Sequence, residues 1–88
     1  MPDFAVEFAS SAAKDLRRLD PPVRQQLLRA MELLRQAPYP SRVAPIAMLQ
    51  GPSPRQYRLR VGDYRIVYRI GGRRVIVARV AHRRDVYR

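Results

Sequence analysis

The 88-residue sequence contains no cysteine and a single histidine, His82. Without cysteine there are no disulfides, thiolate metal centres or cysteine nucleophiles, and one histidine cannot build a multi-histidine metal site. No apolar run is long enough to cross a bilayer, and the start Met1-Pro2-Asp3-Phe4 lacks the basic and apolar segments of a signal peptide. We therefore expect a cytoplasmic protein without a cofactor, whose chemistry is metal-free or uses a borrowed metal.

Acidic residues are also scarce, and the formal net charge is +11. The imbalance lies in the C-terminal half, because residues 55–88 hold eleven arginines against only Asp63 and Asp85. Every cation except Lys14 is arginine, whose planar fork grips phosphate in two places and stacks on bases. This distribution favours a polyanionic partner for the C-terminal half. A charged surface that merely keeps the protein soluble is the alternative interpretation.

The chain is long enough for one compact domain, which we expect to span residues 1–88. Near its start, Phe4, Val6 and Phe8 alternate with other residues, and this spacing predicts a short strand with one buried face. The expected first half therefore begins with β-structure before any helix.

Two helices are predicted next. Ser10 or Ser11 can cap the first helix, and Asp20-Pro21 offers an N-cap followed by proline at the first position of the second. Pro38 ends the second helix. The apolar positions at helical spacing are Leu16 and Leu19 in the first helix and Val23, Leu27, Ala30, Met31 and Leu34 in the second. The two helices form a hairpin.

Residues 38–54 contain five of the eight prolines and predict an irregular connection. The residues expected to attach it to the core are Val43, Ile46, Met48 and Leu49. From residue 55 onward, alternation predicts three strands joined by tight turns at Gly62-Asp63 and Gly71-Gly72. The expected fold is α+β: an N-terminal strand, an α-helical hairpin, and a three-stranded antiparallel meander forming a small curved sheet with the helices on one face.

A two-residue turn at Gly62-Asp63 places Arg60 directly opposite Arg65. Like charges facing across a hairpin repel, so a sequence that keeps this pair favours an anion site there. The same register at Gly71-Gly72 would put Arg69 opposite Arg74 and Arg65 opposite Ala78. One sheet face would then gather Arg58, Arg60, Arg65, Arg69, Arg74 and His82. The helix-facing side would carry Tyr57, Leu59, Tyr64, Ile66, Tyr68, Val75 and Val77.

Clustered arginines near a tyrosine are suited to metal-free phosphodiester cleavage. Cations stabilise the charge that develops on phosphorus, a proton carrier serves as acid or base, and an aromatic ring can hold a base. The substrate would be RNA, because its 2′-hydroxyl supplies the nucleophile. A basic sheet that binds nucleic acid without cutting it fits the same pattern, so these residues alone leave both interpretations open.

The run Tyr57-Arg58-Leu59-Arg60-Val61-Gly62-Asp63-Tyr64-Arg65-Ile66-Val67-Tyr68-Arg69 resembles the C-terminal half of RelE/ParE toxins. The resemblance continues through Val75-Ile76-Val77-Ala78 and the ending from Ala81 to Arg88, and the helix hairpin and Leu49-Gln50-Gly51 also fit. It implies a RelE-like fold and a toxin of a type II toxin–antitoxin system. The implied activity is that of a ribosome-dependent endoribonuclease that cuts mRNA and is silenced by a cognate antitoxin.

The resemblance also implies roles for particular residues. Arg58 and Arg60 match the family's basic strand pair, and the best-known members carry lysine there, one of which is proposed as general base. Arginine cannot take over that role at ordinary pH. Either His82 takes the proton, or Arg60 acts only electrostatically and the ribosome helps, or the protein is a poor nuclease. The expected catalytic set is Arg60, Arg65, His82, Arg83 and Tyr87. The expected RNA-binding set is Arg58, Arg69, Arg74 and Arg84.

Less specific interpretations stand beside these. His82 is as well explained as a structural residue at a strand end, and Tyr57, Tyr64 and Tyr68 are better explained by core packing. Two other functions remain open, namely a ParE-type inhibitor of DNA gyrase without enzymatic activity and a non-toxic basic RNA-binding module. The expected partners are a cognate antitoxin, in a hetero-oligomer, and mRNA on the ribosome, whereas the free protein should be monomeric because its charge opposes self-association.

Overall fold

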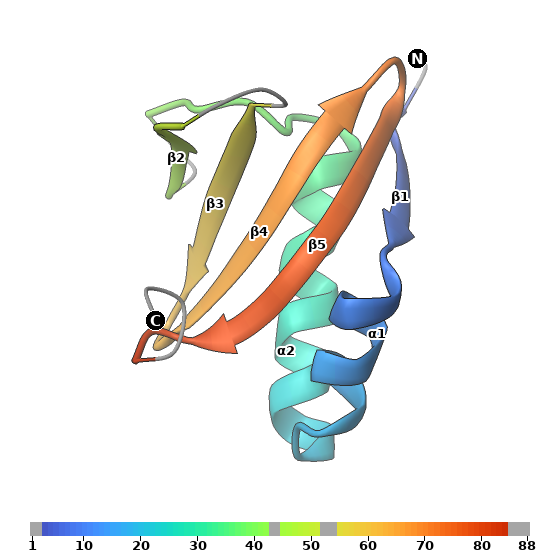
Figure 1. Cartoon of the computed structure of the whole chain (residues 1–88), viewed down its shortest axis with the longest axis vertical. Coiled ribbons are helices and arrows are strands. Elements are labelled where there is room, and N and C mark those ends of the chain that lie inside the picture. The colour runs from blue at the N-terminus through green and yellow to red at the C-terminus, as the bar shows by residue number, and fades with distance from the viewer. Residues whose placement is uncertain (1–2, 43–44, 52–54, 85–88) are drawn as a thin grey trace.

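A five-stranded sheet with two helices on one face is the architecture of this chain (Figure 1). The computed structural model describes residues 3–42, 45–51 and 55–84. The strand order is β1-β5-β4-β3-β2, with β1 parallel to β5 and every other pair antiparallel. The elements are β1 (Ala5–Phe8), α1 (Ser10–Arg17), α2 (Pro21–Met31), the 3-10 turn η1 (Glu32–Arg35), β2 (Ile46–Leu49), β3 (Gln56–Val61), β4 (Tyr64–Gly71) and β5 (Arg74–His82). The α+β fold with a helix hairpin on one face is confirmed.

Strand β2 was not expected from the sequence. It lies inside the proline-rich connection and pairs with β3, from Ile46 opposite Leu59 to Leu49 opposite Gln56. Ile46 is buried, whereas Met48 is exposed and does not serve as the core attachment that was predicted; Val43 lies outside the described residues. Pro45 directly precedes the strand, and its four residues leave too short an alternation to identify it.

The helix starts differ in part from the prediction. Ala9 stands at the N-cap of α1, and neither serine caps the helix, since Ser11 Oγ instead donates a hydrogen bond of 2.7 Å to the carbonyl of Ala78 in β5. Asp20 does occupy the N-cap of α2 with Pro21 in the first turn, as predicted, although its side chain makes no capping hydrogen bond. Both helices are therefore held mainly by their apolar contact with the sheet.

The core lies between the helices and one face of the sheet. Its buried members include Leu27, Leu34, Leu59, Ile66, Tyr68, Val75 and Val77. Tyr57 and Tyr64 are partly buried against this core, which confirms that the three strand tyrosines face the helices. Tyr68 is fully buried and donates a hydrogen bond of 2.7 Å to the carbonyl of Pro38. Burial, with a smaller effect of neighbouring Tyr57, raises the pKa of Tyr68 well above its ordinary value.

The pairing of β4 with β5 differs from the predicted register. The turn falls at Gly72-Arg73 because Gly71 still pairs with Arg74, so Arg69 stands opposite Ile76 and not opposite Arg74. A second change follows further along, where Tyr68 pairs with Val77 but Val67 pairs with Arg79. One extra residue, Ala78, is therefore accommodated in β5 as a β-bulge. As a result Arg65 stands opposite Ala81 and not opposite Ala78.

No helix in the described ranges is both long and apolar enough to span a membrane.

Candidate nucleic-acid interface

The hairpin between β3 and β4 brings two arginines side by side. Val61 pairs with Tyr64 and Arg60 pairs with Arg65, as predicted from the Gly62-Asp63 turn. Gly62 adopts a φ of 57°, in the left-handed region that the turn requires and that glycine enters without strain. Since cross-strand partners share a face, both guanidinium groups leave the sheet on the side away from the helices.

Arg65 is partly buried and turns back onto its own hairpin. Its Nη1 donates to the carbonyl of Tyr64 at 3.1 Å and to that of Gly62 at 3.4 Å. Its Nε is buried and has no hydrogen-bond partner among the residues that the structure describes. A buried donor left unsatisfied costs roughly 1–3 kcal/mol. The side chain would therefore gain by turning toward an anion that could accept more of its hydrogen bonds.

Arg83 reaches the same end of the sheet from β5. Its backbone N–H donates a hydrogen bond of 2.7 Å to the carbonyl of Asp63, and its Nε lies 3.9 Å from Oδ1 of the same residue. Both side chains are exposed, so this ion pair contributes little by itself. The backbone contact nevertheless anchors Arg83 at the turn that joins Arg60 to Arg65. Three predicted site arginines thus converge at this end.

The other predicted arginines spread over the same face. Arg58 pairs with Val67, and Arg69 lies between Gln56 and Ile76 in the register. Val67 is only 8% exposed although it points away from the helices, so neighbouring side chains on this face cover it.

Arg74 shares this face but stands at the opposite end of β5. It is engaged there with Glu7 through two hydrogen bonds of 3.1 Å. Arg74 is therefore separated from the Arg60–Arg65 end by the length of the strand.

His82 does not lie on the arginine face, and its predicted placement there was wrong. It pairs with Tyr64, and the two rings meet edge to face with centroids 5.3 Å apart on the helix-facing side. Its Nδ1 accepts a hydrogen bond of 3.3 Å from the backbone N–H of Arg84. The Ala78 bulge causes the change, because one extra residue reverses which face each later residue of β5 occupies. Ala81 takes the position beside Arg65.

The C-terminal members of the predicted site are only partly described. Arg84 is exposed directly after His82. Tyr87 lies outside the described residues, and its place in the site stays a prediction. No group of three or more histidine, cysteine or acidic residues that could hold a metal occurs within residues 3–42, 45–51 and 55–84.

Two residues that meet beside the bulge, Asp15 and Arg79, were not predicted from the sequence. Asp15 of α1 accepts hydrogen bonds at one oxygen from the N–H of Val80, at 2.8 Å, and from Nε of Arg79, at 2.9 Å. A signal was present in the sequence, because the buried apolar positions of β5 run Val75, Val77 and then Val80, which breaks the period of two.

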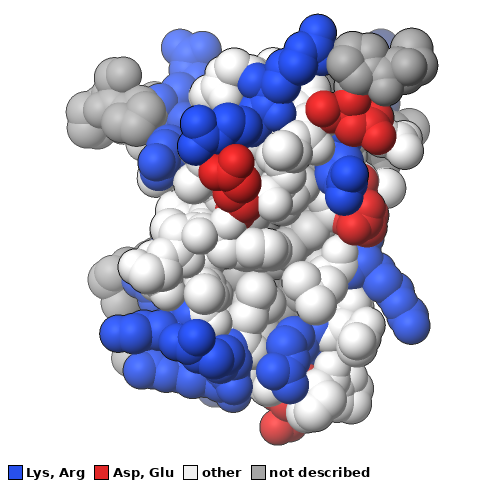
Figure 2. Space-filling model, turned by 90° about the vertical axis from the view of Figure 1, so that its right-hand side faces the viewer, with Lys and Arg blue, Asp and Glu red and all other residues white. Residues whose placement is uncertain are grey.

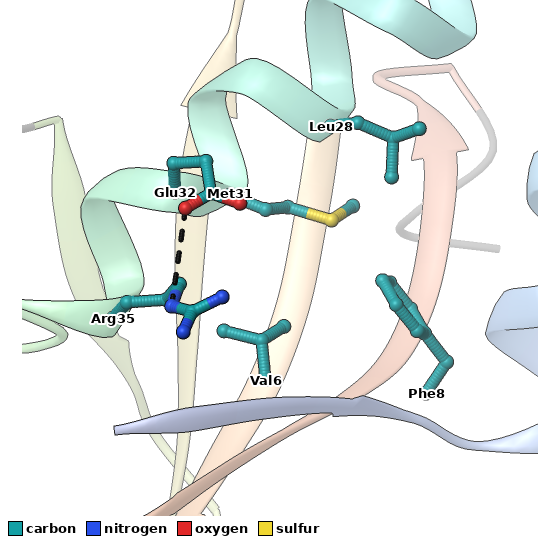
Figure 3. A pocket seen from close by; sticks show the side chains of 6 residues that line it. All are labelled: Val6, Phe8, Leu28, Met31, Glu32 and Arg35. Atoms are coloured by element: carbon teal, nitrogen blue, oxygen red, sulfur yellow. Dashed lines mark ion pairs between the residues drawn. The ribbon is translucent and has the colours of Figure 1, made fainter. Parts of the chain in front are cut away.

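A separate apolar hollow of about 350 Å³ lies between β1 and α2, away from the arginine face. Val6, Phe8, Leu28 and Met31 line it, and the Glu32–Arg35 ion pair closes one side (Figure 3). This hollow contains none of the predicted site residues.

Figure 2 shows the side of the molecule with β1 and α1, where basic side chains gather toward the upper and lower ends and a mostly uncharged band separates them.

Comparison with protein families places the chain. The model of the ParE toxin of the type II toxin–antitoxin system parDE matches residues 6–87. The chain belongs to this family. Members of this family are toxins of type II toxin–antitoxin systems, and the match covers both the helix hairpin and the arginine-rich strands. A comparison with curated protein sequences found no match.

Solved structures similar to this family member include RelE toxins. The toxin–antitoxin complex RelBE2 from Mycobacterium tuberculosis gives 28% identity and a TM-score of 0.77 over 91% of this chain and 98% of that chain. The RelB–RelE complex from Methanococcus jannaschii gives 28% identity and a TM-score of 0.73, with 92% and 94% covered. Isolated RelE from E. coli gives 25% identity and a TM-score of 0.73, with 90% and 83% covered. The expected RelE-like fold is thereby confirmed.

Proposed function

We propose that this toxin is a ribosome-dependent endoribonuclease of the RelE kind, which cuts mRNA and so inhibits translation in the cytoplasm. The observation that carries the proposal is the convergence of Arg60, Arg65 and Arg83 at the β3–β4 turn. Two of them are directly opposite each other, an arrangement that is unfavourable without an anion. The similarity to RelE structures supports the same activity.

The reaction would begin with attack of a ribose 2′-oxygen on the adjacent phosphorus. The P–O5′ bond breaks, so the products are a 2′,3′-cyclic phosphate and a free 5′-hydroxyl. Negative charge grows on the phosphate oxygens in the transition state, and guanidinium groups that face it stabilise that charge. Arg60 and Arg65 would contact the scissile phosphate, while Arg83 would contact it from the β5 side. Arg65 would exchange its turn carbonyls for phosphate oxygens.

Proton transfer needs groups other than these arginines, because guanidinium does not give up its proton at ordinary pH. We assign the leaving-group side to Tyr87, whose hydroxyl can donate a proton. His82 remains a candidate carrier, although its ring packs on Tyr64 and its Nδ1 is engaged by the Arg84 backbone. That hydrogen bond needs the Nδ1 lone pair, so the neutral ring carries its proton on Nε2. The ribosome is the other source of proton carriers.

Arginines beyond the turn would hold the RNA backbone. Arg58 and Arg69 extend the positive face along β3 and β4, and Arg74 continues it toward the far end. Arg84 is exposed in the turn that follows β5 and would add a further contact there. Each phosphate contact made by such a side chain adds affinity that falls as salt rises. The face away from the helices is therefore proposed as the RNA-binding surface.

A cognate antitoxin is proposed as the protein partner, in a hetero-oligomer. The relatives from Mycobacterium tuberculosis and Methanococcus jannaschii are toxins in complex with antitoxins. The free toxin should be monomeric, because a formal charge of +11 on 88 residues opposes self-association.

Inhibition of DNA gyrase without cleavage is the second candidate function. The position of His82 on the helix-facing side favours it, since this leaves the arginine face without a described proton carrier. The match to the ParE family points the same way.

Induced expression in bacteria separates these functions. Cleavage predicts that growth stops together with translation, that mRNA is cut inside reading frames, and that Arg65→Ala restores growth. Arg73→Ala, in the turn at the other end of β4, is the matched control and should leave the arrest intact. Intact mRNA with inhibited DNA supercoiling would establish the gyrase function instead. Growth without arrest would indicate a non-toxic basic RNA-binding module.

A further inference from the structure

The β-bulge in β5 is held by α1. At the bulge, Ala78 is the residue left without a partner on β4, and β1 ends beside it with Phe8 opposite Val77. The backbone groups of residues 78–80 would therefore have no neighbouring strand on the side of β5 where β1 lies. Ser11 Oγ donates to the carbonyl of Ala78 at 2.7 Å.

Asp15 completes this contact one helical turn later. Its side chain is only 12% exposed, and its Oδ2 accepts from the N–H of Val80 at 2.8 Å and from Nε of Arg79 at 2.9 Å. Residues four apart lie on one face of a helix, so Ser11 and Asp15 together satisfy the carbonyl of the bulged Ala78 and the N–H of Val80, two residues later. We call this pair the bulge clamp.

The bulge determines which residues of β5 reach the arginine end. Before it, Val75 and Val77 face the helices, and after it Val80 takes that side, so Ala81 stands beside Arg65. A strand without the bulge would slip by one residue and reverse every later side chain. The same slip would move the Arg83 N–H away from the Asp63 carbonyl, to which it now donates at 2.7 Å.

We propose that Asp15, with Ser11, is a positioning residue for the RNA site, which acts through the β5 bulge to place Arg83 against the β3–β4 turn. The part of this inference that concerns cleavage rests on the proposed function. The part that concerns strand register does not, and it can be measured on the free toxin. Asp15 touches neither RNA nor the converging arginines in this account.

The test compares Asp15→Ala with Arg79→Met. The first variant removes the acceptor for the Val80 N–H, whereas the second removes only the ion pair and leaves that hydrogen bond in place. Asp15→Asn keeps an acceptor oxygen without the charge and serves as the conservative rescue. Nuclear Overhauser contacts between Tyr64 and His82 report the register, and single-turnover cleavage of mRNA on programmed ribosomes reports the site.

Asp15→Ala should lose the Tyr64–His82 contacts and cleave at least about a hundredfold more slowly, since a misplacement of only roughly 1 Å already costs about that much and a one-residue slip moves Arg83 further. Arg79→Met and Asp15→Asn should keep the contacts and most of the cleavage rate. Unchanged contacts in folded Asp15→Ala would overturn the proposal, whatever happens to cleavage. If wild-type toxin cuts no RNA, the proposed function fails. The Tyr64–His82 contacts in the variants still show whether the bulge clamp fixes the register of β5.

Ser11→Ala takes the place of Asp15→Ala if that variant does not fold. It removes only the hydrogen bond to the Ala78 carbonyl. Faster hydrogen exchange at the Arg83 amide, with unchanged exchange at Ile66 in the middle of β4, would support the clamp. Unchanged exchange at both amides, or an equal increase at both, would overturn it, because the second result describes a general loss of stability.

Discussion

Replacing Arg60 by glutamine should make the protein more stable and less active. Like charges directly opposite each other on a hairpin lower the free energy of unfolding, and cross-strand pairs change that free energy by roughly 0.2–1 kcal/mol. Arg60 is exposed and Arg65 turns back onto its own hairpin, so both the solvent and this geometry weaken the repulsion. We expect a gain near the middle of that range, about 0.5 kcal/mol, which raises the Tm of a domain of this size by about 2–4 °C.

Thermal unfolding followed by circular dichroism measures this gain. Because salt screens exposed charges, the difference between Arg60→Gln and wild type should shrink as the salt concentration rises. Cleavage of mRNA on programmed ribosomes should fall by about a hundredfold, the usual effect of removing one donor that stabilises a developing charge. Stability and activity should therefore change in opposite directions.

Arg69→Gln is the matched control for this prediction. Arg69 has Gln56 and Ile76 as its cross-strand partners, so no like charge stands opposite it. The control removes the same charge from the same face but should not raise the Tm. If Arg60→Gln lowered the Tm and left cleavage unchanged, the prediction would be refuted. The arginine pair would then neither destabilise the hairpin nor contribute to binding an anion.

Three further predictions concern stability, each measured by urea unfolding. Tyr68→Phe should lower the free energy of unfolding by about 1–2 kcal/mol, since the buried Pro38 carbonyl loses its hydrogen bond; an unchanged value would mean that another donor replaces it. Gly62→Ala should cost about 1–2 kcal/mol because its φ is 57°; stability equal to wild type would show that the turn can change type. Glu7→Gln should change stability by less than about 0.5 kcal/mol, because its ion pair with Arg74 is exposed.

The arrangement of the two helices and the β3–β4 hairpin could be predicted from local patterns. The Gly62-Asp63 turn fixes the register that pairs Arg60 with Arg65, and apolar spacing identifies the helix faces. These features depend on residues close in sequence, so a short window contains the information needed.

The position of His82 could not be predicted in the same way. It depends on a bulge that is held by a helix more than sixty residues earlier in the chain, through Ser11 and Asp15. Strict alternation gave the wrong face because it assumed an uninterrupted strand, and β2 was missed because it is short and directly follows Pro45. The His82 error arises from contacts between distant segments, which override local patterns, whereas four residues are too few for β2 to show a pattern of its own.

Cleavage of one mRNA bound to programmed ribosomes, in a single turnover, tests most directly whether the converging arginines act on RNA. Wild-type toxin, Arg65→Ala and the control Arg73→Ala should be compared in equal folded amounts. We predict that the wild type and the control cut the message, and that Arg65→Ala cuts it at least about a hundredfold more slowly. Equal cleavage by all three proteins, or an uncut message with the wild type, would contradict the account.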